Sequence, residues 1–336
     1  MKIAINGYGR IGRSFVRALA EREAAGRPAP VSLVAINDLG RAADLLYLTR
    51  YDTTHGRLDA PVALEDGCLR ISGQAPRLFS EARPEDLPWG ELGVDLVLEC
   101  SGHFRGHADA SRHLSAGAGR VIIGAVPFDR ADQTIVYGVN DGDLDPDSRV
   151  LSAASCTTHC VAPVLAALDR EFGVRQALMK EIHAYTSDQT LLDHVHRDPR
   201  RGRAGAQNII PTTSSAIKAV QAVLPALEGR LDGHSIRVPT LNVAMVALTL
   251  LLEHTPAAGD LNPWLRRLSQ ELPALIGYND EPLVSADFNH RPESAVVDAT
   301  QTRVQGEMVQ VVAWYDNEWG YANRLLDWVS DLAGAA

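Results

Sequence analysis

Apolar residues at the start of the chain recur with two different periods. Residues 2–6, KIAIN, run apolar as a buried strand does, and residues 13–23, RSFVRALAERE, place apolar side chains at helical spacing. Residues 7–12, GYGRIG, lie between them and supply the glycines of a turn. The pattern therefore predicts a strand, a glycine turn and a helix, followed by a second strand over residues 31–38, VSLVAIND.

The glycines of this turn are spaced as in a dinucleotide-binding site. Gly7 allows the tight turn, Gly9 lets the backbone approach a pyrophosphate, and Gly12 lets helix and strand pack closely. The helix start offers N–H groups and a partial positive charge to phosphates. Asp38 ends the second predicted strand and is suited to hold ribose hydroxyls; the polar stretch AAGRPAP explains why it lies beyond the usual ~20 residues. The alternative is a glycine turn without a ligand.

Three further apolar runs, at residues 94–102, 120–125 and 134–140, alternate with helix-like or polar stretches. This rhythm is typical of an open parallel sheet, and so of an α/β fold. Because ligands of such sheets lie beyond the carboxyl ends of the strands, we expect Ser101, Gly102 and residues 124–125 to border the nicotinamide half of the cofactor.

A candidate nucleophile follows in residues 150–172, which are predicted to form a strand that leads into a helix. Cys156 lies at the helix start, where the helix N-terminus acidifies a thiol and backbone N–H groups can stabilise an oxyanion. Taken alone, the same pattern fits a buried, inert thiol equally well. His183, at the end of a short strand-like run, can act as the base that Cys156 needs.

Composition and charge narrow the functional classes. With 336 residues the chain is long enough for two domains, and its hydrophobic fraction of 46% and charged fraction of 22% are typical of globular proteins. The formal net charge of -10 disfavours nucleic-acid or anionic-membrane partners. No apolar stretch approaches ~18 residues and the first residues, MKIAING, lack the apolar region of a signal peptide, so we expect a cytoplasmic protein. The four sparse cysteines are expected to be free thiols.

Ten ordered segments, spread from the first predicted strand to the last helix, resemble one enzyme family. They are INGYGRIGR, AIND, YDTTHGR, ECSG, SAASCTTHC, HAYTSDQ, RRGRAGAQNIIPT, IRVPT, LVSADFNH and WYDNEWGYANR. Together they resemble the phosphorylating glyceraldehyde-3-phosphate dehydrogenases. The resemblance implies a Rossmann-type NAD-binding domain over residues 1–155, completed by a C-terminal helix over 320–336. It also implies an α+β catalytic domain with a large antiparallel sheet over residues 156–319.

The resemblance further implies roles for individual residues. Cys156 is then the nucleophile, and His183 is its base and oxyanion partner. The substrate's phosphate is held by Thr186, Asp188 and Arg237. The incoming inorganic phosphate binds near Ser155, Thr157, Arg201, Ser214 and Ser215. The cofactor NAD is bound by Gly7, Gly9, Arg10, Ile11, Gly12, Asp38, Ser101 and Gly102, with Asn317 on the nicotinamide carboxamide and Tyr321 nearby.

The reaction implied by the resemblance is the oxidation of glyceraldehyde 3-phosphate to 1,3-bisphosphoglycerate. The thiolate attacks the aldehyde, a hydride passes to NAD, and inorganic phosphate releases the acyl group from the thioester. The family also implies a homotetramer in which the loop over residues 185–205 reaches the cofactor of a neighbouring subunit.

Several positions depart from the family pattern. His159 stands where the family usually has Asn, and residues 213–215, TSS, stand where it has Ser-Thr-Gly. Ser215 in place of glycine removes freedom for positive φ, so phosphorolysis is expected to be weakened. His194-Val195 and residues 124–126, GAV, also differ from the commoner Leu-Pro and Ser-Ala-Pro beside the cofactor. We expect an altered affinity for NAD rather than a lost site, because the charge of Asp38 would still repel a 2'-phosphate.

Two other functions stay open at this point. Residues 87–102 and 287–304 also resemble erythrose-4-phosphate dehydrogenases, which would use the same thiol chemistry but release an acid to water. A paralogue that binds NAD and catalyses weakly is the second alternative. The pair His194 and His196 lacks further ligands at metal-binding spacing, so no metal is expected. The arginines at 200, 201 and 203 fit an anionic small substrate better than nucleic acid.

Overall fold

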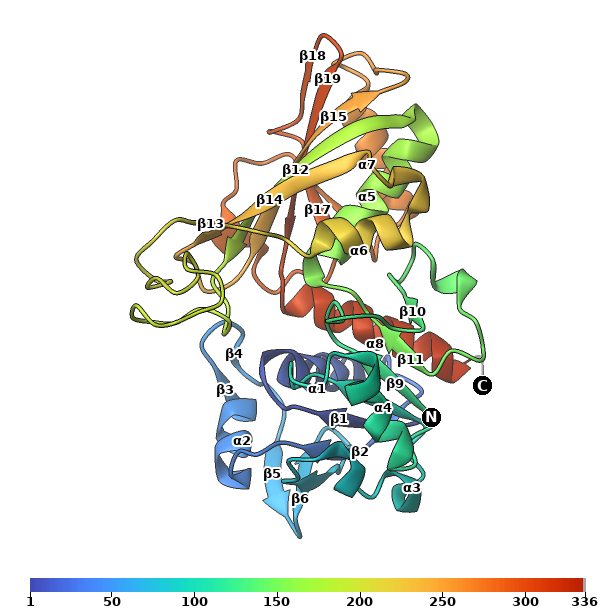
Figure 1. Cartoon of the computed structure of the whole chain (residues 1–336), viewed down its shortest axis with the longest axis vertical. Helices are drawn as coiled ribbons and strands as arrows, with labels where there is room; N and C mark the ends of the chain where they lie inside the picture. The colour runs from blue at the N-terminus through green and yellow to red at the C-terminus, as the bar shows by residue number, and fades with distance from the viewer. Residues whose placement is uncertain (335–336) are drawn as a thin grey trace. The chain divides into compact units, whose positions relative to one another are not determined.

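The computed structural model describes residues 1–334 and divides the chain into two compact units. Unit 1 comprises Met1–Ala154 together with the C-terminal chain from Ala322, and unit 2 comprises Ser155–Tyr321. Each unit is built around its own large β-sheet (Figure 1). Among the described residues, no helix combines the length and the apolar character that crossing a bilayer requires.

Unit 1 begins with the predicted strand, glycine turn and helix. Strand β1 (Lys2–Asn6) leads into α1 (Arg10–Ala24), and β2 (Ser32–Asn37) returns parallel to β1, with Ile5 paired to Ile36. Strand β1 also pairs with β8 (Leu96–Glu99), so it is flanked on both sides. A central parallel strand is buried on both faces, which explains why this segment reads as an apolar run rather than as a strict alternation.

The sheet of unit 1 has the order β10-β11-β9-β8-β1-β2-β7-β6-β5 in the described part of the chain. The parallel strands β7-β2-β1-β8-β9-β11, numbered by their sequence, run in the order 3-2-1-4-5-6 of the Rossmann fold. The remaining strands and helices of this unit are β3 (Tyr51–Asp52), β4 (Gly56–Arg57), β5 (Val62–Glu65), β6 (Cys68–Ile71), β7 (Arg77–Phe79), β9 (Arg120–Ile123), β10 (Gln133–Thr134), β11 (Val150–Ser152), α2 (Ala42–Arg50), α3 (Trp89–Leu92) and α4 (His107–Ser115).

The strand predicted over residues 134–140 is wrong beyond its first residue, because β10 ends at Thr134. The Asn140 side chain accepts a hydrogen bond from the Val136 N–H at 2.8 Å and donates to the Thr134 carbonyl at 3.0 Å. Gly138 adopts a φ of 78° inside the same segment. This apolar run therefore closes into a turn instead of continuing along the sheet.

A buried polar network lies under the carboxyl end of β8. The Trp89 indole donates to His113 Nδ1 at 3.0 Å, so the proton of the imidazole lies on Nε2, 3.1 Å from Glu99 Oε2. Glu99 also accepts from the Asn6 side chain at 2.5 Å and from the Ser101 N–H at 2.7 Å. One carboxylate thus joins the ends of β1 and β8 to α4.

Unit 2 contains an eight-stranded sheet in the order β13-β14-β12-β15-β19-β17-β16, with β18 paired to β19, in the described part of the chain. Most pairs are antiparallel, as expected, but β12–β14 and β16–β17 are parallel. Figure 1 shows the long strands β12, β14 and β15 side by side. The elements are β12 (Val174–Ala184), β13 (Ile210–Thr212), β14 (Leu231–Val238), β15 (Ala244–Leu252), β16 (Ile276–Asn279), β17 (Ala295–Asp298), β18 (Arg303–Gln305), β19 (Met308–Tyr315), α5 (Cys156–Phe172), α6 (Ala216–Val223) and α7 (Leu261–Glu271), followed by α8 (Trp319–Gly334), which continues into unit 1.

Helix α5 covers one face of this sheet. It contacts β12, β15, β17 and β19 and packs beside α6. Between Ala177 and His183 of β12, buried positions alternate with exposed or half-buried ones, so that every second side chain points toward the protein interior. The start of α5 and the inward positions of β12 are therefore brought together inside one unit.

We predict that His113→Ala destabilises unit 1 by about 2–4 kcal/mol, because it leaves a buried indole N–H and a buried carboxylate short of a partner and opens a cavity. His107→Ala is the control, since His107 bonds to Asp132 at 2.8 Å near the surface and contributes less than ~1 kcal/mol. Urea unfolding followed by far-UV circular dichroism measures both variants. Equal losses in the two variants would show that the network does not stabilise the unit.

Candidate active site and dinucleotide site

The start of α5 presents Cys156 on the first turn of the helix. Ser155 caps this helix, because its Oγ accepts a hydrogen bond from the Thr158 N–H at 3.1 Å. Ala154, just before the cap, adopts a left-handed φ of 53°, an uncommon conformation for a residue with a Cβ. The first N–H groups of a helix have no partners inside the helix. Cys156 therefore lies beside backbone donors that suit a developing oxyanion.

His183 faces Cys156 from β12. Its Nε2 lies 3.7 Å from the Cys156 sulfur, and its Nδ1 lies 2.6 Å from the carbonyl oxygen of Ala184. A carbonyl only accepts, so Nδ1 carries the proton and the Nε2 lone pair points toward the sulfur. Burial, together with the positive charge of Arg237, lowers the pKa of His183. The imidazole is thus neutral at neutral pH and ready to take a proton from the thiol.

The thiol of Cys156 is not acidified at rest, which corrects the expectation from its place at the helix start. Burial, reinforced by the negative charge of Glu181, raises the pKa of Cys156 to about 12. The thiolate must therefore form by transfer of the proton to His183 as the sulfur attacks.

Glu181 is a buried carboxylate in this site that the sequence interpretation missed. It precedes His183 by two residues on β12, shares its face and is only 2% exposed. Its Oε1 accepts from the Thr157 hydroxyl at 2.5 Å and from the Tyr315 hydroxyl at 3.3 Å, and lies 4.0 Å from His183 Nε2. Burial alone would raise the pKa of Glu181, but His183, Thr157 and Arg237 outweigh it and lower the pKa. The period of two along the strand was the signal that could have located this residue.

Arg237 is placed beside His183 by strand register. Strands β12 and β14 run parallel with His183 opposite Arg237, and the Arg237 guanidinium donates to the Thr186 hydroxyl at 3.3 Å. Its Nε is buried without a hydrogen-bond partner among the described residues. Arg237 and Thr186 therefore form a cationic, hydrogen-bonding corner that suits a phosphate.

Asp188 and Arg201, predicted for the two phosphate sites, pair with each other. Arg201 Nη1 donates to Asp188 Oδ2 at 2.8 Å, and its Nε donates to the Thr212 hydroxyl at 2.9 Å. Asp198 adds a second carboxylate 3.6 Å from the same guanidinium. The positive charge of Arg201 is thus offset by two neighbouring carboxylates.

The serines predicted near the inorganic phosphate make local contacts, and the side chain of Ser214 also interacts with the carboxylate of Glu181. The hydroxyl of Ser155 caps α5, and the hydroxyl of Ser214 accepts from the Ala216 N–H at 3.3 Å. Ser215 has a φ of -74°. The expected loss of positive-φ freedom at Ser215 is therefore wrong as a source of strain, since this position adopts a conformation open to any residue.

The glycine turn of unit 1 fits a bound dinucleotide. Gly7 has a φ of 92°, and a Cβ there would lie 2.3 Å from the Ser101 backbone nitrogen. A Cβ on Gly12 would lie 2.5 Å from the Gly7 carbonyl oxygen, whereas one on Gly9 would meet nothing within 4 Å. Helix α1 has no side-chain cap and no acidic residue in its first turn. The turn thus keeps an open approach to a helix start that attracts phosphate.

Asp38 lies directly against this turn. Its Oδ2 accepts from the Tyr8 N–H at 2.7 Å and its Oδ1 from the Gly40 N–H at 2.8 Å. The side chain of Arg10 pairs with Asp52, and its backbone begins α1, where a phosphate would bind. The next residue, Ile11, is half-buried.

The segment after β8 forms the other side of the predicted dinucleotide site. Ser101 is held by its bond to Glu99, and Gly102 has a φ of 77° with open space where a side chain would be. Strands β1 and β8 are neighbours where the strand order of the sheet reverses. Ligands of such sheets lie at this point, beyond the carboxyl ends of the strands.

Asn317 and Tyr321 belong to unit 2 and are both buried. Asp316 Oδ1 accepts from the backbone N–H groups of Glu318 and Trp319 at 2.9 and 2.7 Å and so fixes the turn that carries Asn317. The Oδ1 atom of Asn317 has no hydrogen-bond partner among the described residues. Tyr321 packs edge-on against His159, with ring centroids 5.4 Å apart. Asn317 can therefore accept a bond from an amide such as a carboxamide.

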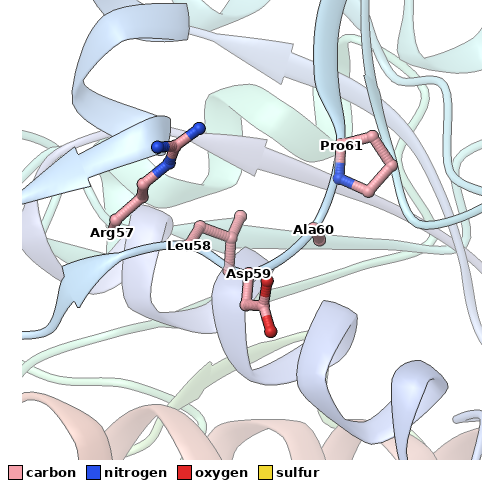
Figure 2. Close-up of a pocket in the computed structure, with 5 residues that line it drawn as sticks. All are labelled: Arg57, Leu58, Asp59, Ala60 and Pro61. Carbon is pink, nitrogen blue, oxygen red and sulfur yellow. The ribbon is translucent and has the colours of Figure 1, made fainter.

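A hollow of about 560 Å³ lies along the loop from β4 to β5 in unit 1. Figure 2 shows its lining residues, Arg57, Leu58, Asp59, Ala60 and Pro61. None of the predicted site residues lines it. Within residues 1–334, no group of three or more His, Cys, Asp or Glu side chains is arranged to hold a metal ion.

Two protein-family profiles match the chain. The NAD binding domain of glyceraldehyde 3-phosphate dehydrogenase matches residues 1–107, and the C-terminal domain of the same family matches residues 155–317. A glyceraldehyde-3-phosphate dehydrogenase of Cupriavidus necator is 47% identical over 100% of this chain and 99% of its own length. Those of Pseudomonas aeruginosa and Geobacillus stearothermophilus are 46% and 45% identical over at least 99% of this chain and 98% of their own length.

We predict that Gly7→Ala abolishes or strongly weakens dinucleotide binding, because its Cβ would overlap the backbone after β8. Gly26→Ala is a matched control: Gly26 also has a positive φ, of 70°, but a Cβ there meets nothing within 4 Å. Because both variants carry similar backbone strain, a difference in their affinity for NAD, measured by calorimetric titration, reports the overlap of the new Cβ with the backbone of Ser101. Equal binding by the two variants would contradict the placement of the cofactor at this turn.

Proposed function

Because the chain belongs to the glyceraldehyde-3-phosphate dehydrogenase family, we propose that it oxidises glyceraldehyde 3-phosphate with NAD through a thioester on Cys156. The observation that carries the proposal is the 3.7 Å contact between the Cys156 sulfur and the unprotonated Nε2 of His183. A thiol beside a neutral, correctly oriented imidazole is the arrangement that covalent attack on an aldehyde requires.

In the proposed reaction, Arg237 and Thr186 bind the phosphate of the substrate and so direct its aldehyde toward Cys156. As the sulfur bonds to the aldehyde carbon, His183 Nε2 takes the thiol proton. Backbone N–H groups at the start of α5 then stabilise the oxygen of the hemithioacetal. NAD, when bound, supplies the hydride acceptor. His183 passes the thiol proton to the same oxygen, which completes the hemithioacetal, and takes it back as the hydride leaves and the thioester forms. The proton is then released to solvent.

We assign NAD to the glycine turn of unit 1. Gly7, Gly9 and Gly12, with Arg10 and Ile11 at the helix start, would surround the pyrophosphate. Asp38 would accept from the ribose, and Ser101 and Gly102 would border the nicotinamide half. Asn317 would accept from the carboxamide, with Tyr321 nearby. Residues 1–155 with 320–336 as the NAD-binding domain, and 156–319 as the catalytic domain, complete this assignment.

The acyl acceptor in the proposal is inorganic phosphate, which gives 1,3-bisphosphoglycerate as in glycolysis. The erythrose-4-phosphate alternative is not favoured, because the similar relatives named above are glyceraldehyde-3-phosphate dehydrogenases over their full length. The alternative of a weakly catalytic paralogue is disfavoured by the intact contact between Cys156 and His183.

A homotetramer is also part of the proposal. The loop over residues 185–205 exposes three apolar side chains, Leu191, Leu192 and Val195, at 76%, 79% and 91%. Such an exposed apolar cluster supports burial against a neighbouring subunit. All four cysteines are free, and a reaction that needs a reduced thiol suits the cytoplasm.

The first test compares glyceraldehyde 3-phosphate with erythrose 4-phosphate, each with and without inorganic phosphate, by NADH formation. We expect the higher kcat/KM with the three-carbon aldehyde, because Arg237 and Thr186 set the distance between its phosphate and the thiol. Phosphate-independent turnover that favours the four-carbon sugar would assign the enzyme to the alternative. If neither aldehyde gives NADH, the chain is neither a glyceraldehyde-3-phosphate nor an erythrose-4-phosphate dehydrogenase.

A second test changes the nucleophile. Cys156→Ser should lower turnover by at least about 10³-fold while NAD still binds, because a hydroxyl at this position is a far weaker nucleophile. Cys68→Ser, on β6 of unit 1, should keep normal turnover. NADH formation and calorimetric titration with NAD measure the two properties separately. Substantial activity in Cys156→Ser would rule out the covalent mechanism.

A further inference from the structure

The mechanism above leaves one buried charged group of the site unused. Glu181 is 2% exposed, and its carboxylate accepts from the hydroxyls of Thr157 and Tyr315 beside the nucleophile. We propose that Glu181 is a specificity-determining residue that weakens the binding of inorganic phosphate at the acyl-enzyme and so shifts release of the acyl group toward water. This inference rests on the proposed function and concerns its second half-reaction.

The acyl acceptor must attack the carbonyl carbon that is bonded to the Cys156 sulfur. The hydroxyl of Thr157 lies beside this sulfur, with its Oγ1 at 4.0 Å. Its single hydrogen is donated to Glu181 Oε1 at 2.5 Å. The Thr157 hydroxyl therefore offers lone pairs, and no donor, to an approaching anion.

The hydroxyl of Tyr315 is engaged in the same way. It lies 2.9 Å from Thr157 Oγ1 and 3.3 Å from Glu181 Oε1, and both atoms can accept its hydrogen. Two hydroxyl hydrogens beside the nucleophile are thus turned toward one carboxylate. An anionic acceptor needs such donors, whereas water can both donate and accept.

Charge acts in the same direction. Against burial, the pKa of Glu181 is lowered by His183, by the bond from Thr157 and by the charge of Arg237, so its carboxylate is ionised at neutral pH. Arg237 is bonded to Thr186 and, in the proposed function, binds the substrate's own phosphate. Arg201 is offset by Asp188 and Asp198. A carboxylate about 6 Å from a phosphate, at an effective dielectric constant of ~20, weakens binding on the order of 10- to 100-fold.

Water has no charge to be repelled, and Glu181 helps to activate it. The negative charge of Glu181 works to raise the pKa of His183, against burial, and so strengthens this base. In hydrolysis the water oxygen bonds to the acyl carbon while one water proton moves to His183 Nε2. The carbon–sulfur bond then breaks, and the proton returns to the sulfur of Cys156. The products are the free acid and the thiol, with no change of oxidation state.

The test replaces Glu181 by a neutral residue and measures KM for inorganic phosphate. Glu181→Gln should lower this KM on the order of 10- to 100-fold and reduce the ratio of free acid to acyl phosphate. Glu181→Asp keeps the charge and should keep a high KM. Glu307→Gln is the matched control: it removes an equal charge from an exposed residue near Arg175, so it should leave KM unchanged. An unchanged or higher KM in Glu181→Gln overturns the proposal.

Two further measurements distinguish a failure of the inference about Glu181 from a failure of the proposed function. A burst of NADH from wild-type enzyme without phosphate reports formation of the acyl-enzyme. The absence of any NADH formation defeats the proposed function rather than the role of Glu181. If Glu181→Gln does not fold, Glu181→Ser tests the same loss of charge with a smaller side chain. A wild-type KM for phosphate well below about 1 mM, the upper end of ordinary KM values, overturns the inference without any variant.

Discussion

The contact between the Cys156 sulfur and His183 Nε2 depends on the register of one strand. β12 alternates its side chains, so Glu181 and His183 point to the same interior face, toward the start of α5. A shift of this strand by one residue would turn both away. The parallel pairing with β14 then sets Arg237 opposite His183. The base, the carboxylate and the cation that we propose binds phosphate are thus positioned by pairing within a single sheet, and they face the nucleophile at the start of α5.

In unit 1 a single carboxylate performs a comparable positioning role. Glu99 ends β8 and is bonded to Asn6 at the end of β1, to Ser101 and to His113. The positive φ of Gly7 brings the backbone of the turn so close to Ser101 that no side chain fits. These contacts hold the strand ends together at the edge of the sheet where ligands of such folds bind.

Much of this could be predicted from periodicity and local chemistry. The glycine turn, the parallel strands, and the strand and helix around Cys156 follow from short-range patterns, which are strong where strands are buried. The segment over residues 134–140 failed because its turn depends on side-chain bonds of Asn140, which an apolar pattern does not show. Glu181 was missed because its importance comes from tertiary neighbours, Thr157 and Tyr315, and the pairing of Asp188 with Arg201 was hidden for the same reason.

The central claim is that Cys156, activated by His183, carries the acyl group. Its most direct test is the mass of the intact protein after a single turnover with glyceraldehyde 3-phosphate and NAD, without inorganic phosphate, quenched in acid. The account predicts a mass increase of one phosphoglyceroyl group per chain, located by peptide mapping on the peptide that begins α5 and assigned to Cys156. NADH formation without any adduct, or an adduct on Cys160 instead, would contradict it.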